Sequence, residues 1–150
     1  MNDRIKKTYD SLFFDFNSLT ELLSTDNYIS KVSGNYLNMF MLQATYEIID
    51  VHKNKFFTPL IDKIVKDFNL VNCKIDVNLF VGFTQGAASI IHKDGYDVFL
   101  YGLYGETMYV VDKEKYILKQ GDLIKINKEE IHQSISLSPR IVFSLGVHYG

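Results

Sequence analysis

The stretch DVFLYGLYGETMYVVDKEKYILKQGDLIKI, residues 97–126, decides the fold class that we predict for this chain. Apolar side chains are grouped in short runs, in part at every second position, and the runs end at residues that favour turns: Gly105, Asp112-Lys113-Glu114 and Gln120-Gly121. A period of two interrupted by such turns is typical of β-strands joined by tight connections. We therefore predict strands near residues 97–103, 107–112, 115–119 and 122–126.

The same pattern continues on both sides of this stretch. Residues 75–83 and 88–92 precede it, residues 132–137 and 140–147 follow it, and each of the four is predicted as a further strand. Eight short strands with no long helix between them favour an antiparallel jelly roll or a small barrel.

Before residue 75 the spacing of apolar residues is helical instead. Ser18 and Glu21 form a capping box that opens a short helix over residues 19–23. A longer helix is predicted from about Tyr36 to His52. A third begins at Thr58-Pro59, where the hydroxyl caps the helix and the proline takes its first turn. We expect these helices, in residues 1–72, to pack on a barrel formed by residues 73–150.

Composition bounds the class of protein. With 150 residues, 47% of them hydrophobic, the chain can bury one substantial core, and we predict a single domain over residues 1–150. A net charge of −2 gives no electrostatic case for duplex nucleic acid or an anionic membrane surface. The single cysteine excludes an internal disulfide and a Cys-based zinc site. No apolar run approaches the ~20 residues of a membrane span, and MNDRIKKTYD leads into no signal-like apolar core. We expect a soluble, cytoplasmic protein.

Three residues form a candidate metal site. His92 and Asp94 are two residues apart on a predicted strand, so their side chains point to the same face. His132 begins a later predicted strand, and if the two strands are neighbours, three ligand atoms converge at the mouth of the barrel. Two imidazoles and one carboxylate with open positions opposite suit Fe(II), although this donor set also permits Mn, Ni or Zn.

These residues resemble the two motifs of the cupin superfamily. Gly86, His92, Asp94 and Gly105 fall on the places of the first motif, and Gly121 with His132, eleven residues on, reproduces the second. The resemblance implies a double-stranded β-helix, the cupin jelly-roll barrel.

Some family positions carry other residues. Val98 stands at the place of the first motif's usual glutamate, while Asn127 and Glu129 replace the proline and glycine of the second motif. The His-x-Asp form, with Ser89-Ile-Ile-His92-Lys-Asp94 ahead of Asp97-Val-Phe99-Leu, looks like the JmjC-type cupins. That resemblance covers roughly residues 76–149.

The JmjC-type resemblance implies an enzyme. It would be a mononuclear non-haem Fe(II) dioxygenase with the metal on His92, Asp94 and His132, and with 2-oxoglutarate as co-substrate. It would hydroxylate a small molecule or a peptide. Two alternatives stay open: a metal-dependent cupin isomerase, lyase or dioxygenase that uses no 2-oxoglutarate, and a non-enzymatic ligand-binding cupin.

The co-substrate anchor is predicted less directly. The lysine that commonly binds 2-oxoglutarate in this group corresponds here to Thr107. Arg140, eight residues after His132, resembles the basic residue that binds the far carboxylate in other 2-oxoglutarate oxygenases, with Ser144 as an assisting hydroxyl. A guanidinium suits this role because its planar fork meets a carboxylate with two parallel hydrogen bonds; a surface arginine is the alternative. Tyr109 is a further candidate for contact with the carboxylate.

Aromatic residues gather in the N-terminal half, as Phe13-Phe14, Phe16 and Phe56-Phe57. Packing of helices on the sheet explains them most simply. A homodimer interface is the alternative, since aromatic residues are also enriched at interfaces.

Overall fold

The computed structural model describes residues 4–25, 30–32 and 45–150. It contains two helices, two 3-10 turns and eleven strands within those ranges. The helices are α1 (Phe16–Thr25) and α2 (Thr58–Asp67), and the 3-10 turns are Val51–Lys53 and Lys55–Phe57. The strands are β1 (Ile5–Lys6), β2 (Ser30–Val32), β3 (Tyr46–Ile48), β4 (Cys73–Gly82), β5 (Gly86–Ala87), β6 (Asp97–Tyr104), β7 (Thr107–Val111), β8 (Glu114–Leu118), β9 (Leu123–Ile126), β10 (His132–Ser136) and β11 (Arg140–Tyr149).

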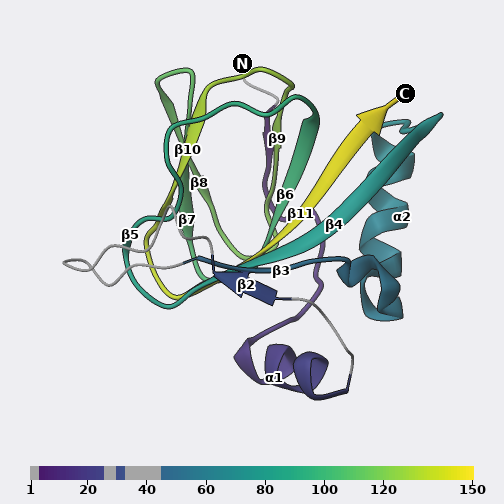
Figure 1. Ribbon diagram of the computed structural model, residues 1–150, viewed down its shortest axis with the longest axis vertical. Helices are drawn as coiled ribbons and strands as arrows, with labels where there is room; N and C mark the ends of the chain where they lie inside the picture. The colour runs from purple at the N-terminus through teal and green to yellow at the C-terminus, as the bar shows by residue number, and fades with distance from the viewer. Residues whose placement is uncertain (1–3, 26–29, 33–44) are drawn as a thin grey trace.

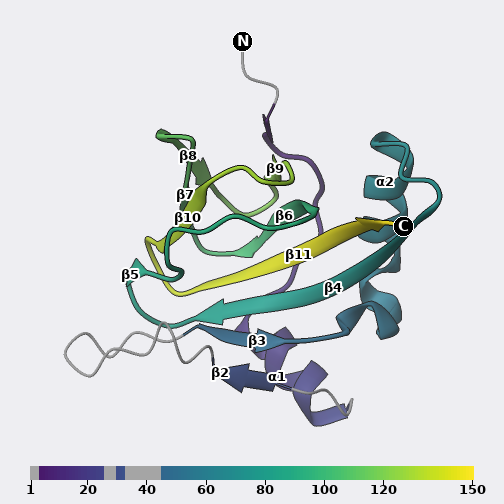
Figure 2. The same cartoon turned by 45° about the horizontal axis from the view of Figure 1, so that its top comes forward.

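The strands form two sheets in which every neighbouring pair is antiparallel. The larger sheet has the order β1-β9-β6-β11-β4-β3-β2 and the smaller one the order β5-β10-β7-β8. Figures 1 and 2 show the two sheets facing each other, with α1 and α2 on the outer side of the larger sheet. The predicted jelly-roll barrel is therefore confirmed.

Seven of the eight predicted strands are present, and the prediction for residues 88–92 is wrong. Only Gly86–Ala87 and a single bridge between His92 and His132 pair with β10. The N–H groups of Ala88 and Ser89 both donate to the carbonyl of Ser134, at 2.9 and 3.3 Å. Two residues opposite one is the pattern of a bulge, so the ladder is interrupted here.

The predicted helix over residues 36–52 is wrong in its second half. Residues 36–44 lie outside the described part of the chain, residues 46–48 form β3, and Val51–Lys53 is a 3-10 turn. β3 pairs with β4 and extends the larger sheet. Asp50 adopts a left-handed conformation (φ 61°), which a continuing α-helix does not permit. The N-terminal part of the chain therefore contributes strands as well as helices.

Two helix caps also differ from the prediction. α1 begins at Phe16, one residue after Asp15, whose carboxylate accepts from the N–H and the hydroxyl of Ser18 at 2.9 and 3.0 Å. The capping box is therefore Asp15 with Ser18, not Ser18 with Glu21. α2 has its proline in the first turn as predicted, but Thr58 is already its first residue, and the N-cap is Phe57, which makes no side-chain hydrogen bond.

Both faces of the larger sheet are buried. On the inner side, Val98, Leu100 and Val142 pack against side chains of the smaller sheet. On the outer side, a separate cluster joins this sheet to α1, α2 and the turn before α2 through Leu22, Phe57, Leu60, Ile64, Phe99, Phe143 and Leu145. Alternate residues of β6 and β11 thus enter different cores, which explains why both strands are apolar at almost every position.

The aromatic residues of the N-terminal half divide between the core and the surface. Phe14 and Phe57 are buried in the outer cluster, where Phe57 lies against the ring of Phe143 with centroids 5.8 Å apart. Phe13 and Phe56 are exposed. Among the described residues, no helix combines the length and apolar character that a membrane crossing requires.

Candidate functional site

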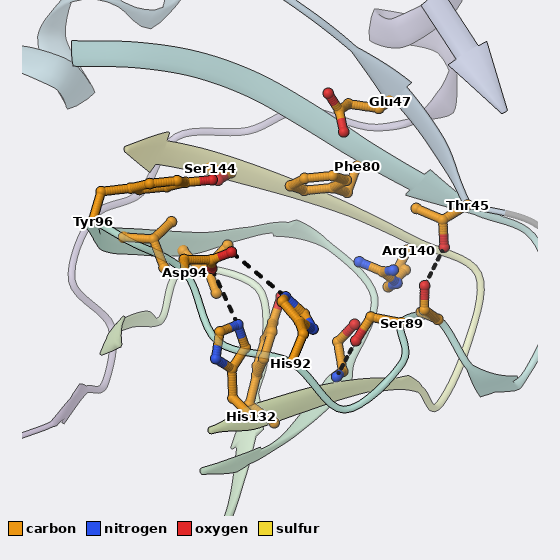
Figure 3. A pocket seen from close by; sticks show the side chains of 15 residues that line it. Thr45, Glu47, Phe80, Ser89, His92, Asp94, Tyr96, His132, Arg140 and Ser144 are labelled. Atoms are coloured by element: carbon orange, nitrogen blue, oxygen red, sulfur yellow. Dashed lines mark hydrogen bonds and ion pairs between the residues drawn. The ribbon is translucent and has the colours of Figure 1, made fainter. Parts of the chain in front are cut away.

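The structure brings His92, Asp94 and His132 together at one end of the barrel (Figure 3). His92 and His132 form an isolated bridge, in which each donates its N–H to the other's carbonyl, at 2.9 and 2.8 Å. Asp94 follows the bridge and turns its carboxylate toward both rings, 3.8 Å from Nε2 of His92 and 3.4 Å from Nε2 of His132. One ligand atom from each residue lies within 4.8 Å of the others.

Backbone carbonyls orient both imidazoles. Nδ1 of His92 is 2.7 Å from the carbonyl of Ile90, and Nδ1 of His132 is 2.9 Å from the carbonyl of Glu130. A carbonyl only accepts, so each Nδ1 carries the proton of the neutral ring and Nε2 keeps its lone pair. This second interaction is how proteins fix the tautomer and direction of a metal-binding histidine.

Charge and burial act together at the same three residues. Contact with His132 lowers the pKa of Asp94 below its usual range, and the charges of both imidazoles add to this against the opposing effect of burial. Burial lowers the pKa of His132, but the hydrogen bonds that its protonated ring makes with Asp94 and with the carbonyl of Glu130 outweigh it, and the net pKa is raised. In the neutral form of both rings, two Nε2 lone pairs and one carboxylate form a donor set that suits a divalent cation such as Fe(II).

The loop between β9 and β10 holds Asp94 in place. The N–H of Glu129 donates to the carbonyl of Asp94 at 2.8 Å, and the N–H of Lys128 donates to the carboxylate of Asp97 at 2.7 Å. Glu129 adopts φ 68°, which is unusual for a residue with a side chain. It stands at the place where the motif resemblance expects a glycine, a residue that adopts positive φ without strain.

A cavity of about 270 Å³ adjoins the three residues. Ligand pockets span about 300–1,000 Å³, so this cavity lies near the small end of that range and suits a small organic molecule. The lining combines apolar walls with polar groups from both sheets. The lining residues are Thr45, Glu47, Phe80, Ala88, Ser89, His92, Asp94, Tyr96, Val98, Leu100, Tyr109, His132, Ser134, Arg140 and Ser144.

Arg140 and Tyr109 are the unusual members of this lining. Arg140 is 2% exposed, and within the described residues its guanidinium forms one hydrogen bond, from Nε to the hydroxyl of Ser136 at 2.6 Å, and has no carboxylate within 4.0 Å. Burial lowers its pKa. Burial also raises the pKa of Tyr109 to about 12, partly offset by the charge of Arg140. The cavity thus contains a buried cation beside a neutral phenol.

Solved structures place this architecture among known folds. The chain is similar to the ribosomal oxygenase YcfD of Escherichia coli, at 17% identity and a TM-score of 0.75, over 97% of this chain and 47% of that one. A structure of YcfD with cobalt and 2-oxoglutarate matches at 16% identity and a TM-score of 0.75, over 97% and 48%. The fold is that of the JmjC-like cupins. The chain spans about half the length of the YcfD chains it matches.

Sequence comparison adds nothing to this assignment of fold. No protein-family model and no curated protein sequence matches the chain. A cupin superfamily protein from Desulfitobacterium hafniense matches over 50% of this chain and 68% of that one, at 17% identity and a TM-score of 0.47, a likeness too weak to argue from.

Within this fold, six of the seven predicted site residues line the same cavity: His92, Asp94, His132, Tyr109, Arg140 and Ser144. Thr107 does not line it. It is buried on β7 between its register partners Ser136 and Leu118.

Nine lining residues are not among the predicted site residues, and three of them are Thr45, Glu47 and Tyr96. Thr45 and Glu47 lie at β3, inside the stretch predicted as helix, and Thr45 donates its hydroxyl to the carbonyl of Ala88 at 2.9 Å. Tyr96, two residues after Asp94, also lines the cavity. The assignment of Tyr46–Ile48 to a strand next to β4 would have found the first two.

Proposed function

We propose that this chain is a metal-dependent oxygenase that binds Fe(II) through His92, Asp94 and His132 and uses 2-oxoglutarate to hydroxylate a small molecule or a peptide. One observation carries the proposal. A three-donor metal site and a buried guanidinium without a carboxylate partner line the same cavity.

The chain's residues have defined tasks in this proposal. His92 and His132 would hold the ion through Nε2 because their Nδ1 protons are bound to carbonyls. Asp94 would complete one face of the ion and leave the opposite positions open. When bound, Fe(II) supplies the oxidative chemistry with O₂ that amino acid side chains lack.

Arg140 and Tyr109 would hold the co-substrate. A guanidinium forms two parallel hydrogen bonds with a carboxylate, and such bonds are strong when buried. The Tyr109 phenol, whose pKa burial raises further above neutral pH, can donate a further hydrogen bond. Apolar side chains of the wall, Phe80, Val98 and Leu100, would keep bulk water from the reacting groups.

The test needs no knowledge of the substrate. The protein is incubated aerobically with Fe(II), ascorbate and 2-oxoglutarate, and succinate is measured, because slow uncoupled decarboxylation of the co-substrate produces it. We expect succinate from the wild type and none from His132→Ala. His52→Ala is the matched control, since this histidine is exposed outside the cavity, and it should behave as the wild type.

A specific observation favours a second candidate. Thr107, at the place of the lysine that commonly binds 2-oxoglutarate, lies outside the cavity lining. A metal-dependent cupin enzyme without 2-oxoglutarate would therefore bind Fe(II) through the same three residues but form no succinate. Metal binding in the absence of succinate formation would support this second function and reject the first.

A further inference from the structure

Ser136 contacts the buried cation of the cavity. Its hydroxyl accepts the hydrogen bond from Nε of Arg140 at 2.6 Å, and both side chains are buried, at 4% and 2% exposure. Ser136 is the last residue of β10, in the smaller sheet, and Arg140 is the first residue of β11, in the larger sheet. The bond therefore links the two sheets beside the turn that joins them.

These two groups meet beside a glycine of a third strand. Gly82, at the end of β4, pairs with Arg140 across the larger sheet. A Cβ at position 82 would lie 3.5 Å from the hydroxyl oxygen of Ser136 and 3.6 Å from Nε of Arg140. The hydroxyl and the guanidinium therefore pack together over the face of Gly82, and three strands define their position.

The choice of nitrogen determines what the guanidinium can still do. A guanidinium has five N–H donors in one plane. With Nε bound to Ser136, the four donors on the two terminal nitrogens remain, and their outer edge is the one that binds a carboxylate with two parallel bonds. The same bond restricts rotation of a side chain that otherwise has many rotamers. Within the described residues no other protein group holds this guanidinium.

We propose that Ser136 is a positioning residue, which holds Arg140 by Nε so that its terminal N–H groups face a carboxylate in the cavity. This rests on the proposed function, in which 2-oxoglutarate supplies that carboxylate. Ser136 does not line the cavity and so acts only through Arg140. Because immobilising a flexible side chain before binding lowers the entropic cost of binding, loss of the hydroxyl should weaken 2-oxoglutarate binding about 3- to 10-fold.

The experiment measures equilibrium binding. Calorimetric titration of 2-oxoglutarate into Fe(II)-loaded protein under argon avoids turnover, since O₂ is absent, and Fe(II) affinity is measured separately. We expect Ser136→Ala to weaken 2-oxoglutarate binding about 3- to 10-fold with unchanged Fe(II) affinity, and Ser136→Thr, which keeps the hydroxyl, to restore most of it. Ser24→Ala, which removes an exposed hydroxyl on α1, is the control and should bind as the wild type.

A double variant tests whether Ser136 acts through Arg140. In Arg140→Lys the Nε–H donor is absent, so adding Ser136→Ala should cause no further loss of 2-oxoglutarate affinity. Losses that simply multiply would overturn the proposal, and so would wild-type binding by Ser136→Ala. If Ser136→Ala does not fold, Ser136→Cys, whose sulfur accepts hydrogen bonds weakly, replaces it with the same expectation.

Arg140→Ala separates this inference from the proposed function. If Arg140→Ala loses 2-oxoglutarate binding while Ser136→Ala does not, only the role of Ser136 is rejected. If Arg140→Ala also binds 2-oxoglutarate as the wild type does, both the carboxylate anchor and its positioning by Ser136 are rejected.

Discussion

The buried guanidinium of Arg140 dominates the site at the scale of single residues. A charge removed from water without a carboxylate partner loses hydration that a single serine hydroxyl does not replace. An anionic ligand would supply the missing partner. Arg140 therefore favours the bound protein over the free one, and its replacement should affect binding and stability in opposite directions.

The binding prediction concerns Arg140→Ala and Arg140→Lys. Loss of a charge-assisted bidentate contact should cost roughly 1.5–3 kcal/mol, so Arg140→Ala should bind 2-oxoglutarate at least 10-fold more weakly. Arg140→Lys should recover only part of this, because a point charge does not replace the planar fork. Calorimetry measures both, with Fe(II) affinity as the reference that should stay nearly constant. Equal 2-oxoglutarate affinity in all three proteins would place the anchor elsewhere, with Tyr109 the next candidate.

The stability prediction concerns Arg140→Met. A flexible apolar side chain of similar length fills the space without an unpaired charge, and even buried charges that are paired can be replaced by apolar side chains with gains of up to about 4 kcal/mol. We expect the ligand-free variant to unfold at higher urea concentration than the wild type. Adding Fe(II) and 2-oxoglutarate should reverse the order, because only the wild type gains a ligand partner. A lower urea midpoint for ligand-free Arg140→Met would contradict this account.

Gly105 provides the third prediction. It has φ +73°, and a Cβ there would lie 2.0 Å from the carbonyl oxygen of Pro139. Gly105→Ala should therefore lower the free energy of unfolding by more than about 2 kcal/mol, measured by urea denaturation. Gly95→Ala is the matched control, since nothing lies within 4 Å of a Cβ at that position and φ is not in the left-handed region. Similar effects of the two substitutions would show that the close approach to Pro139 does not matter.

Single residues explain why the motifs could be found from sequence. Gly86, Gly105 and Gly121 all have positive φ, a conformation that glycine adopts without strain, so their spacing reflects fixed backbone geometry. No comparable sequence pattern identifies Ser136. Its importance depends on the pairing register that sets it beside Arg140 over Gly82, and register is not visible in the order of residues.

At the scale of elements, pairing overrides local pattern. Tyr46–Ile48 is part of a stretch with helical spacing, yet it forms β3 because β4 offers a long strand to pair with. The irregular segment between β5 and β6 differs from its prediction in the opposite direction. The alternation of apolar and polar residues predicted a strand over 88–92, but the bulge opposite Ser134 interrupts the pairing of this segment with β10. Because the segment after Ala87 leaves its pairing with β10, Asp94 can approach both imidazoles. Neither outcome is determined within the segment itself.

The fourth prediction concerns α2. Ile64 is fully buried where α2 packs on the outer face of the larger sheet, away from the cavity. Ile64→Ala should lower the free energy of unfolding by about 2–5 kcal/mol, as large-to-small core substitutions do. Fe(II) affinity of the folded variant should stay unchanged, because the ligands lie inside the barrel. Asp62→Ala, exposed on the same helix, is the control and should change stability by less than about 0.5 kcal/mol.

At the scale of the whole molecule, several hydrogen bonds and an ion pair connect the segment before α1 to the barrel. Arg4 binds the carboxylate of Glu130 with both terminal nitrogens, at 2.5 and 2.6 Å. The N–H of Thr8 donates to the buried carboxylate of Asp122 at 2.9 Å, and Tyr101 on β6 donates its hydroxyl to the carbonyl of Asp10 at 3.0 Å. Regions far apart in sequence therefore unfold together, and a titrating group at this contact affects the whole fold.

Tyr101 supplies the pH prediction. Its side chain is fully buried, and burial, with a smaller contribution from the charge of Asp10, raises its pKa to about 12. The ordinary value is about 10, so the fold favours the neutral phenol. The stability that depends on it is therefore fully present below pH 10 and is lost as pH rises from about 10 toward 12. Tyr101→Phe removes this titration while keeping the ring in the core.

The measurement compares the free energies of unfolding of wild type and Tyr101→Phe at pH 9 and pH 11. Other tyrosines with a raised pKa, including Tyr9 and Tyr109, destabilise both proteins equally at high pH. The difference in unfolding free energy between wild type and variant therefore reports on Tyr101 alone. With a folded pKa two units above the unfolded one, wild type should lose roughly 1 kcal/mol more than the variant over this interval. A difference independent of pH would mean that Tyr101 is ionised as easily in the fold as in the unfolded chain. The Tyr101 hydroxyl would then not be shielded from water by the segment that contains Asp10.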